Sequence, residues 1–152
     1  MLSVAEIMTR EPYTLGPDDT LADARKLMAE HHIRHVPIVS PEGTLVGVVS
    51  QRDVLAASDS SLAGGGAGDY NSTALSDLMT APVQTTEPSA SLRGAAMFLQ
   101  QNRLGCLPVL EDGKLVGIVT DSDYVSVAIN LMEQLELVEP QENDGLYDED
   151  DF

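Results

Sequence analysis

The chain has 152 residues, of which 25 are acidic and eight are lysine or arginine, so its formal net charge at pH 7 is −17. This length suits one ordinary domain, or two small units that share a core. The acidic balance argues against a nucleic-acid partner, because a phosphate backbone requires a basic surface. No apolar run approaches the roughly 20 residues of a membrane span, and the start MLSVAEIM lacks a signal-peptide pattern. We expect a cytoplasmic protein that binds neither nucleic acid nor membrane.

The first half of the chain predicts a short helix, a strand, a longer helix, two strands and a final helix. Ser3 and Glu6 have the spacing of a capping box, ahead of a helix of one to two turns. Thr20 is expected to cap the longer helix. The runs VPIV and LVGVV, joined by a turn at 41–43, predict an antiparallel hairpin. The longer helix should face the core with residues that recur at helical spacing: Leu21, Ala24, Leu27 and Met28.

The second half repeats the first in the same order. Met79-Thr80 matches Met8-Thr9, LPVL matches VPIV, and LVGIVTDSD at 115–123 matches LVGVVSQRD at 45–53. Its longer helix carries Leu92, Ala95, Ala96 and Leu99 at the same spacing. The chain is therefore a duplicated unit with an α+β (mixed α/β) fold, and we expect the two repeats to pack with pseudo-two-fold symmetry.

The repeat boundaries follow from composition. We place the first repeat at 1–58 and the second at 75–138, joined by a glycine- and serine-rich linker at 59–74 that should be flexible. The tail at 139–152 is half carboxylates, so it is expected to be disordered, with a specific acidic docking motif as the alternative.

Each repeated string ends in a hydroxyl residue followed three places later by an aspartate. Ser50 precedes Asp53, and Thr120 precedes Asp123. One interpretation is purely structural: the hydroxyl caps a helix, and the carboxylate suits the positive end of the helix dipole. The other is a nucleotide site, because a helix N-terminus can hold phosphate while a carboxylate accepts the hydroxyls of a ribose. The residues alone leave both open.

The duplicated region, from about Ser3 to Val138, resembles a tandem pair of cystathionine-β-synthase (CBS) domains, or Bateman module. The resemblance rests on the IMT and LMT starts, the HVPIV and CLPVL strands, and the two strings GVVSQRD and GIVTDSD. Among such modules the chain is most similar to small stand-alone bacterial proteins labelled acetoin-utilisation-like, a label that is not a demonstrated activity.

The resemblance implies a sensor of adenosyl ligands, with AMP, ADP, ATP or S-adenosylmethionine in clefts between the repeats. The aspartate would hold the ribose, and the preceding hydroxyl would help to hold phosphate. Two ligand sets follow by position. The first set comprises Ser50, Asp53, Gln84, Thr85, Leu104, Gly105, Cys106 and Pro108. The second set comprises Thr120, Asp123, Tyr13, Thr14, Ile33, Arg34, His35 and Pro37.

The run His31-His32-Ile33-Arg34-His35 allows three interpretations. Two histidines on one helical face could bind a metal, although matching carboxylate or cysteine ligands are missing nearby. The run could simply be a solvated helix end, where cations suit the dipole. It could also contact phosphate, since Arg34, Arg52 and Arg103 all lie beside the repeated strings. We expect phosphate contact and no metal.

No nucleophile, base or metal is arranged for catalysis, so we expect a regulatory module rather than an enzyme. Its ligand would be an adenine nucleotide or S-adenosylmethionine, with no required cofactor and an unidentified effector protein as a further partner. The alternatives are a structural dimerisation module with unoccupied sites and an unrecognised nucleotide hydrolase. The lone cysteine, Cys106, is expected to be a buried core thiol rather than a reactive one.

We also expect a homodimer, because CBS pairs commonly associate through their helices. The residues that favour this association are Met28, Met97, Met132 and Leu135. The alternative is that the methionines only fill the core of one chain.

Overall fold

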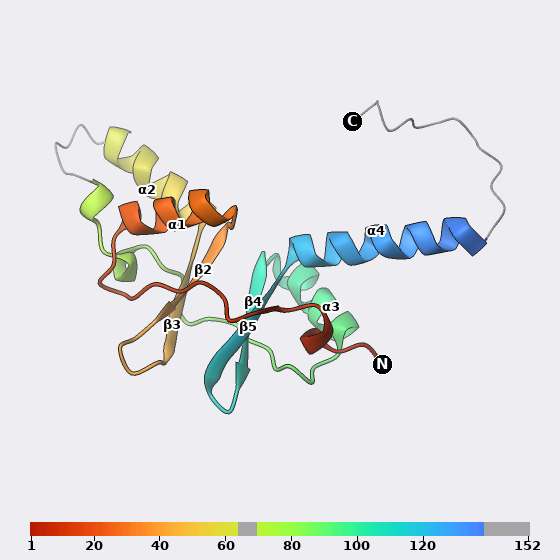
Figure 1. The fold of residues 1–152 in the computed structure, drawn as a ribbon. Coiled ribbons are helices and arrows are strands. Elements are labelled where there is room, and N and C mark those ends of the chain that lie inside the picture. The colour runs from red at the N-terminus through yellow and green to blue at the C-terminus, as the bar shows by residue number, and fades with distance from the viewer. Residues whose placement is uncertain (64–69, 139–152) are drawn as a thin grey trace. The chain divides into compact units, whose positions relative to one another are not determined.

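The computed structural model describes residues 1–63 and 70–138 (Figure 1). Two compact units divide the chain, one from Met1 to Asp121 and the other beginning at Ser122. Within the described residues, no helix has both the length and the apolar character needed to cross a membrane. The elements in order are the 3-10 turn η1 (Val4–Glu6), β1 (Thr9–Arg10), α1 (Leu21–His31), β2 (His35–Val39), β3 (Leu45–Ser50), α2 (Gln51–Ala63), the 3-10 turns η2 (Tyr70–Ser72) and η3 (Leu75–Asp77), α3 (Leu92–Asn102), β4 (Cys106–Glu111), β5 (Lys114–Thr120) and α4 (Asp121–Val138).

Helix α1 begins at the Thr20 cap that its sequence predicts. The N–H of Asp23 donates to the Thr20 hydroxyl at 3.3 Å, and the Asp23 carboxylate accepts the Thr20 N–H at 2.9 Å, which completes a capping box. The helix ends where His32 takes a left-handed conformation with a φ of 54°. The helical-spacing prediction is confirmed, since Leu21, Ala24 and Met28 are buried on one face.

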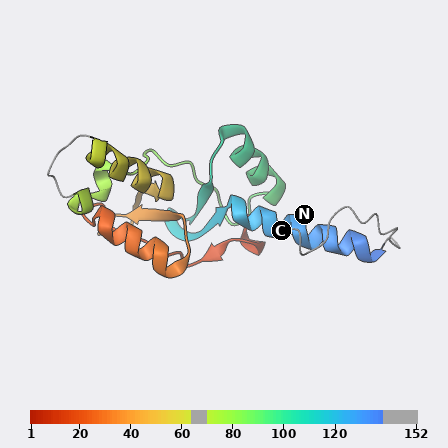
Figure 2. The same cartoon turned by 90° about the horizontal axis from the view of Figure 1, so that it is seen from above.

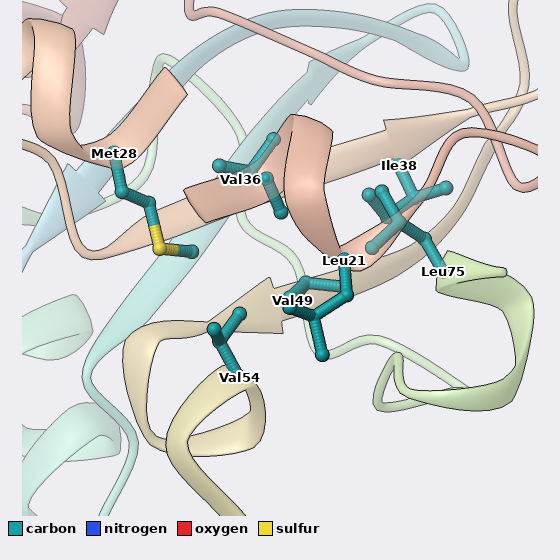
Figure 3. Packing of buried hydrophobic residues seen from close by; sticks show 8 residues of the cluster. Leu21, Met28, Val36, Ile38, Val49, Val54 and Leu75 are labelled. Carbon is teal, nitrogen blue, oxygen red and sulfur yellow. The ribbon is translucent and has the colours of Figure 1, made fainter. Parts of the chain in front are cut away.

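The first core lies between α1, α2 and the β2–β3 hairpin (Figures 2 and 3). Val36 and Ile38 of β2, Val49 of β3 and Val54 of α2 meet the buried face of α1. Alternate residues of a strand point to the same face, so the two residues of β2 reach the core together. Leu75 completes this core from η3, well outside the first repeat along the chain.

Both expected hairpins are present and antiparallel. In the first, Val36 pairs with Val49, and in the second Leu107 pairs with Val119. The second turn is the two-residue pair Asp112-Gly113, whose φ angles are both positive, 52° and 78°. Glycine and aspartate tolerate such angles, and this turn twist suits the strands of a tight hairpin.

The leading segment of each repeat packs on the other repeat, which the sequence pattern did not predict. Thr9 of β1 pairs with Ile118 of β5, and Thr80 forms the matching bridge to Val48 of β3. The N–H of Val4 donates to Ala90 at 2.9 Å just before α3, so the red start of the chain in Figure 1 lies beside the second repeat. One sheet therefore has the order β1-β5-β4, and the other is the β2–β3 pair.

The expected repeat boundaries compare with the structure as follows. Helix α2 continues to Ala63, and η2 lies at Tyr70–Ser72, both within the 59–74 segment interpreted as a linker. The rest of that segment, at 64–69, and the acidic tail at 139–152 lie outside the described residues.

Candidate functional site

The first hydroxyl–aspartate string forms a capping box at the junction of β3 and α2. The Asp53 N–H donates to the Ser50 hydroxyl at 3.1 Å, and the Asp53 carboxylate accepts the Ser50 N–H at 2.9 Å. These bonds match those of Thr20 and Asp23 at α1, where no ligand role is expected. This geometry agrees with the structural interpretation, in which the hydroxyl and the carboxylate cap the start of the helix. It leaves the hydroxyl proton of Ser50 and the second carboxylate oxygen of Asp53 as further bonding groups.

Part of the first ligand set is gathered along β4. The N–H of Thr86 donates to Pro108 at 3.0 Å, and the N–H of Leu110 donates to Thr86 at 2.9 Å, so the chain around Thr85 runs beside this strand. Pro108 is buried, whereas Gln84 and Thr85 are exposed. Leu104 and Gly105 lead into β4, which begins at Cys106, and all three residues are partly buried.

Part of the second set is gathered along β2 in the equivalent way. The N–H of Leu15 donates to Pro37 at 3.2 Å, which brings Tyr13 and Thr14 to the edge of this strand. The Tyr13 ring is half exposed and stacks on His31, with ring centroids 3.9 Å apart. Pro37 is buried and Arg34 is exposed. This set therefore supplies an exposed aromatic pair, Tyr13 and His31, and an exposed guanidinium, that of Arg34.

Thr120 and Asp123 lie on different elements, β5 and α4. Thr120 is the last residue of β5 and pairs with Cys106 of β4. Asp123 lies in the first turn of α4, in the second compact unit. The ligand-binding role expected of Asp123 therefore rests on its place in the repeated string.

The ends of β2 and β4 meet where the two ligand sets come together. The His35 imidazole packs against Gly105, whose carbonyl accepts the Asp121 N–H at 3.0 Å. Burial lowers the pKa of His35, the carboxylates of Asp121 and Asp53 oppose that shift, and Arg34 adds to it. The sequence had not placed Asp121 in either ligand set. Its place directly after Thr120 in the string is the signal that marks it.

Cys106 is a free thiol at this same junction. Burial, with a smaller contribution from the Asp121 charge, raises the pKa of its thiol to about 12. The thiol therefore stays protonated at neutral pH, which agrees with the expectation that it is unreactive. Its side chain is only partly buried, however, so Cys106 is not the core residue that was expected.

A groove of about 230 Å³ beside α3 was also not expected. A comparison of the two repeats explains this groove. Thr86 is at the position of Leu15 in the first repeat, and Gly94 is at the position of Asp23. The smaller side chains leave space that Leu15 helps to fill against the first core. One residue of the first ligand set, Thr85, lines this groove. The lining residues are Thr85, Thr86, Ala90, Ser91, Gly94, Ala95, Phe98 and Leu107.

The geometry of the histidine run differs from the one considered for a metal. His31 is the last residue of α1, His32 is left-handed, and His35 begins β2, so His31 and His35 do not share a helical face. Over residues 1–63 and 70–138, no three His, Cys, Asp or Glu side chains gather as a metal site would require.

The CBS domain family profile matches residues 4–60 and 75–130, which cover both repeats. The chain belongs to the CBS domain family. This confirms the resemblance drawn from the repeated strings, and with it the α+β fold of a CBS pair.

Two curated relatives show how the match is distributed. The chain is 30% identical to the CBS domain-containing protein YhcV of Bacillus subtilis over 132 residues, which are 87% of each chain. It is 32% identical to a homoserine O-acetyltransferase of Methanocorpusculum labreanum over 127 residues, 84% of this chain but only 24% of that enzyme. The enzyme relative is therefore matched only over its CBS part.

Solved structures give the same assignment. AcuB of Vibrio cholerae, which carries a provisional assignment to acetoin utilization, is 46% identical with a TM-score of 0.76, over 92% of this chain and 99% of that one. CBSX2, solved in complex with AMP, is 29% identical with a TM-score of 0.73, over 87% and 99%. The CBS pair of MJ0100, solved with 5′-methylthioadenosine and S-adenosyl-L-methionine, is 26% identical with a TM-score of 0.74, over 86% and 98%. CBS pairs similar to this chain thus bind adenosyl ligands.

Proposed function

We propose that this protein is a cytoplasmic regulatory module that binds an adenine nucleotide, or another adenosyl ligand, in clefts between its CBS repeats. The observation that carries the proposal is the Ser50–Asp53 pair at the start of α2, repeated in the chain as Thr120–Asp123. The ligands named for CBSX2 and MJ0100 share an adenosine group, which supports the same ligand class here.

In the first cleft, the first turn of α2 supplies the groups that a nucleoside phosphate needs. Its backbone N–H groups and the helix dipole favour a phosphate beside Ser50. The second carboxylate oxygen of Asp53 can accept a ribose hydroxyl. Gln84, Thr85 and Pro108 would then form the wall for the base. The neutral Cys106 thiol adds no charge that would repel the phosphate.

The second cleft would use Thr120 and Asp123 in the same roles, with the β2 edge in place of the β4 edge. Its distinguishing group is Arg34, which stands where the second repeat has Gly105. A charge-assisted contact to phosphate is roughly twice as strong as a neutral one. We therefore propose that phosphorylated adenosines favour this cleft. Arg52, inside the string of the first cleft, acts in the opposite direction.

The module would act as a homodimer or through an effector protein, either of which would respond to whether the ligand is bound. Taken by itself, α4 has a broad apolar face, and its Met132 and Leu135 are 60% and 64% exposed. Met97 of α3 is 45% exposed. Met28, also expected at the dimer interface, is 6% exposed and belongs to the first core. For Met28 the alternative of core filling is the correct one, while the other three residues remain candidates.

One observation favours the alternative of a structural module with unoccupied sites. The two Ser50–Asp53 bonds have the same pattern as the backbone bonds of the Thr20–Asp23 cap, so capping alone accounts for them. This shared pattern also provides a matched control. Asp53→Ala and Asp23→Ala both remove a capping carboxylate, but only Asp53 belongs to a ligand set.

Calorimetric titration with AMP, ADP, ATP and S-adenosylmethionine tests the proposal. The wild type and Asp23→Ala should bind at least one of them alike, and the Asp53→Ala/Asp123→Ala protein should not. A thermal-shift screen gives a second readout, because a ligand at 100 times its Kd stabilises the fold by roughly 2.7 kcal/mol. Absence of heat and of a thermal shift with all four ligands would support the structural alternative.

A further inference from the structure

His35 and Gly105 are in direct contact, although they belong to different ligand sets. A Cβ atom at Gly105 would lie 2.5 Å from the His35 Nε2 and 2.9 Å from its Cε1, closer than non-bonded atoms can approach. Gly105 is not among the described residues with positive φ. A glycine is therefore needed at this position because the His35 imidazole leaves no room for a side chain, and not because of the backbone conformation of Gly105.

Each end of this contact is joined to one hydroxyl–aspartate string. On the first side, His35 pairs with Ser50 across the hairpin, and the Gln51 N–H donates to the carbonyl of Arg34 at 2.8 Å. On the second side, Gly105 accepts the Asp121 N–H at 3.0 Å, one residue after Thr120. A continuous path of bonded and packed groups thus runs from the start of α2 to the start of α4.

We propose that the two clefts are coupled through the His35–Gly105 contact, so that a ligand in one changes the affinity of the other. This rests on the proposed function, since it concerns the regulation of the same clefts. A phosphate bound at the start of α2 would shift Ser50 and Gln51, and with them the strand end that carries His35. The imidazole has no free space against Gly105, and closely packed groups transmit such a shift rather than absorb it. The displaced Gly105 carbonyl would then shift the Asp121 N–H that donates to it.

A double-mutant cycle without ligand tests the contact itself. Gly105→Ala should displace the imidazole and speed amide hydrogen exchange at both Gln51 and Asp121 at least fivefold, the lower end of typical coupling between sites. In the double variant His35→Ala/Gly105→Ala, these two amides should exchange at the same rates as in His35→Ala. The reason is that the methyl group added at position 105 then occupies the space left by the imidazole. Gly94→Ala is the matched control, since its Cβ would meet Ser91 at an ordinary 3.4 Å. The proposal is overturned if Gly105→Ala leaves Gln51 unchanged, or if the double variant is as fast as the two single effects combined.

A second experiment uses AMP on the Asp123→Ala protein, in which only the first cleft retains its aspartate. If the clefts are coupled, saturating AMP should change the rate of amide hydrogen exchange at Gln51. It should also change the rate at Asp121 by at least fivefold. A change at Gln51 alone would overturn the coupling and leave the proposed function standing. No change at either amide would overturn AMP binding in the first cleft, and the coupling with it.

Discussion

Met79 of the second repeat lies directly against Gly47 in β3 of the first, where any larger residue would collide with its side chain. Met8 occupies the equivalent place against Gly117 in β5, with its Sδ 2.7 Å from the position of an added Cβ. Two glycines at matching points of the repeat therefore each receive a methionine from the other repeat. This reciprocal exchange makes the cores of the two repeats depend on each other.

The first prediction concerns this dependence. Chains cut between Gly65 and Gly66 should each fold poorly when expressed alone, because each half lacks the segment that the other half supplies to its core. Mixing the halves should restore native circular dichroism and a cooperative unfolding transition. Two halves that unfold cooperatively by themselves would show that the exchange is dispensable.

The second prediction tests the same exchange with one side chain. Leu75 is fully buried in the first core, so Leu75→Ala should lower the free energy of unfolding by about 2–5 kcal/mol in chemical denaturation. Leu55→Ala is the control, because Leu55 is 58% exposed and surface truncations typically stay within about 0.5 kcal/mol. Equal effects of the two substitutions would place Leu75 outside the core.

The third prediction concerns pH. Burial lowers the pKa of His35 below its ordinary value near 6.5, so the native state resists a proton that the unfolded state accepts. Stability should therefore fall as the pH drops from about 7.5 through 6.5, by at most about 1.4 kcal/mol per pH unit from this residue. His35→Gln should flatten that part of the stability curve in urea titrations. An unchanged slope in His35→Gln would show that this imidazole does not cause the loss of stability.

The fourth prediction ranks the two clefts. Asp123→Ala should remove most AMP affinity in calorimetry, and Asp53→Ala should remove less, because Arg34 serves the second cleft. Arg34→Ala should reduce the difference between the two aspartate variants. Equal losses, or a larger loss in Asp53→Ala, would reverse the ranking.

The fifth prediction concerns assembly. Light scattering at micromolar concentration should give the mass of a homodimer, and Met132→Glu with Leu135→Glu should give a monomer, because a charge on the apolar face of α4 opposes its burial. Glu133→Gln, on the same helix, should remain dimeric. A wild-type monomer mass would instead leave the apolar face of α4 to a different partner.

The sequence by itself determined the elements, the duplication and the family. Hydrophobic spacing predicted the buried face of α1, and the runs VPIV and LVGVV predicted the first hairpin, since both patterns depend only on the local period of a helix or strand. The hydroxyl–aspartate strings were recognisable for the same reason. Their spacing places the two groups on one helix start, and Ser50 and Asp53 are found bonded there.

Only the tertiary structure decided which repeat each leading segment completes. Val4 and Leu75 could be buried equally well in their own repeat or in the other one, because the two repeats have similar sequences. No local pattern therefore distinguishes the two possibilities. The meeting of His35 with Gly105 likewise depends on how two strand ends approach, 70 positions apart along the chain. Contacts of this kind arise from long-range packing, whereas sequence periodicity reports only which side of an element is buried.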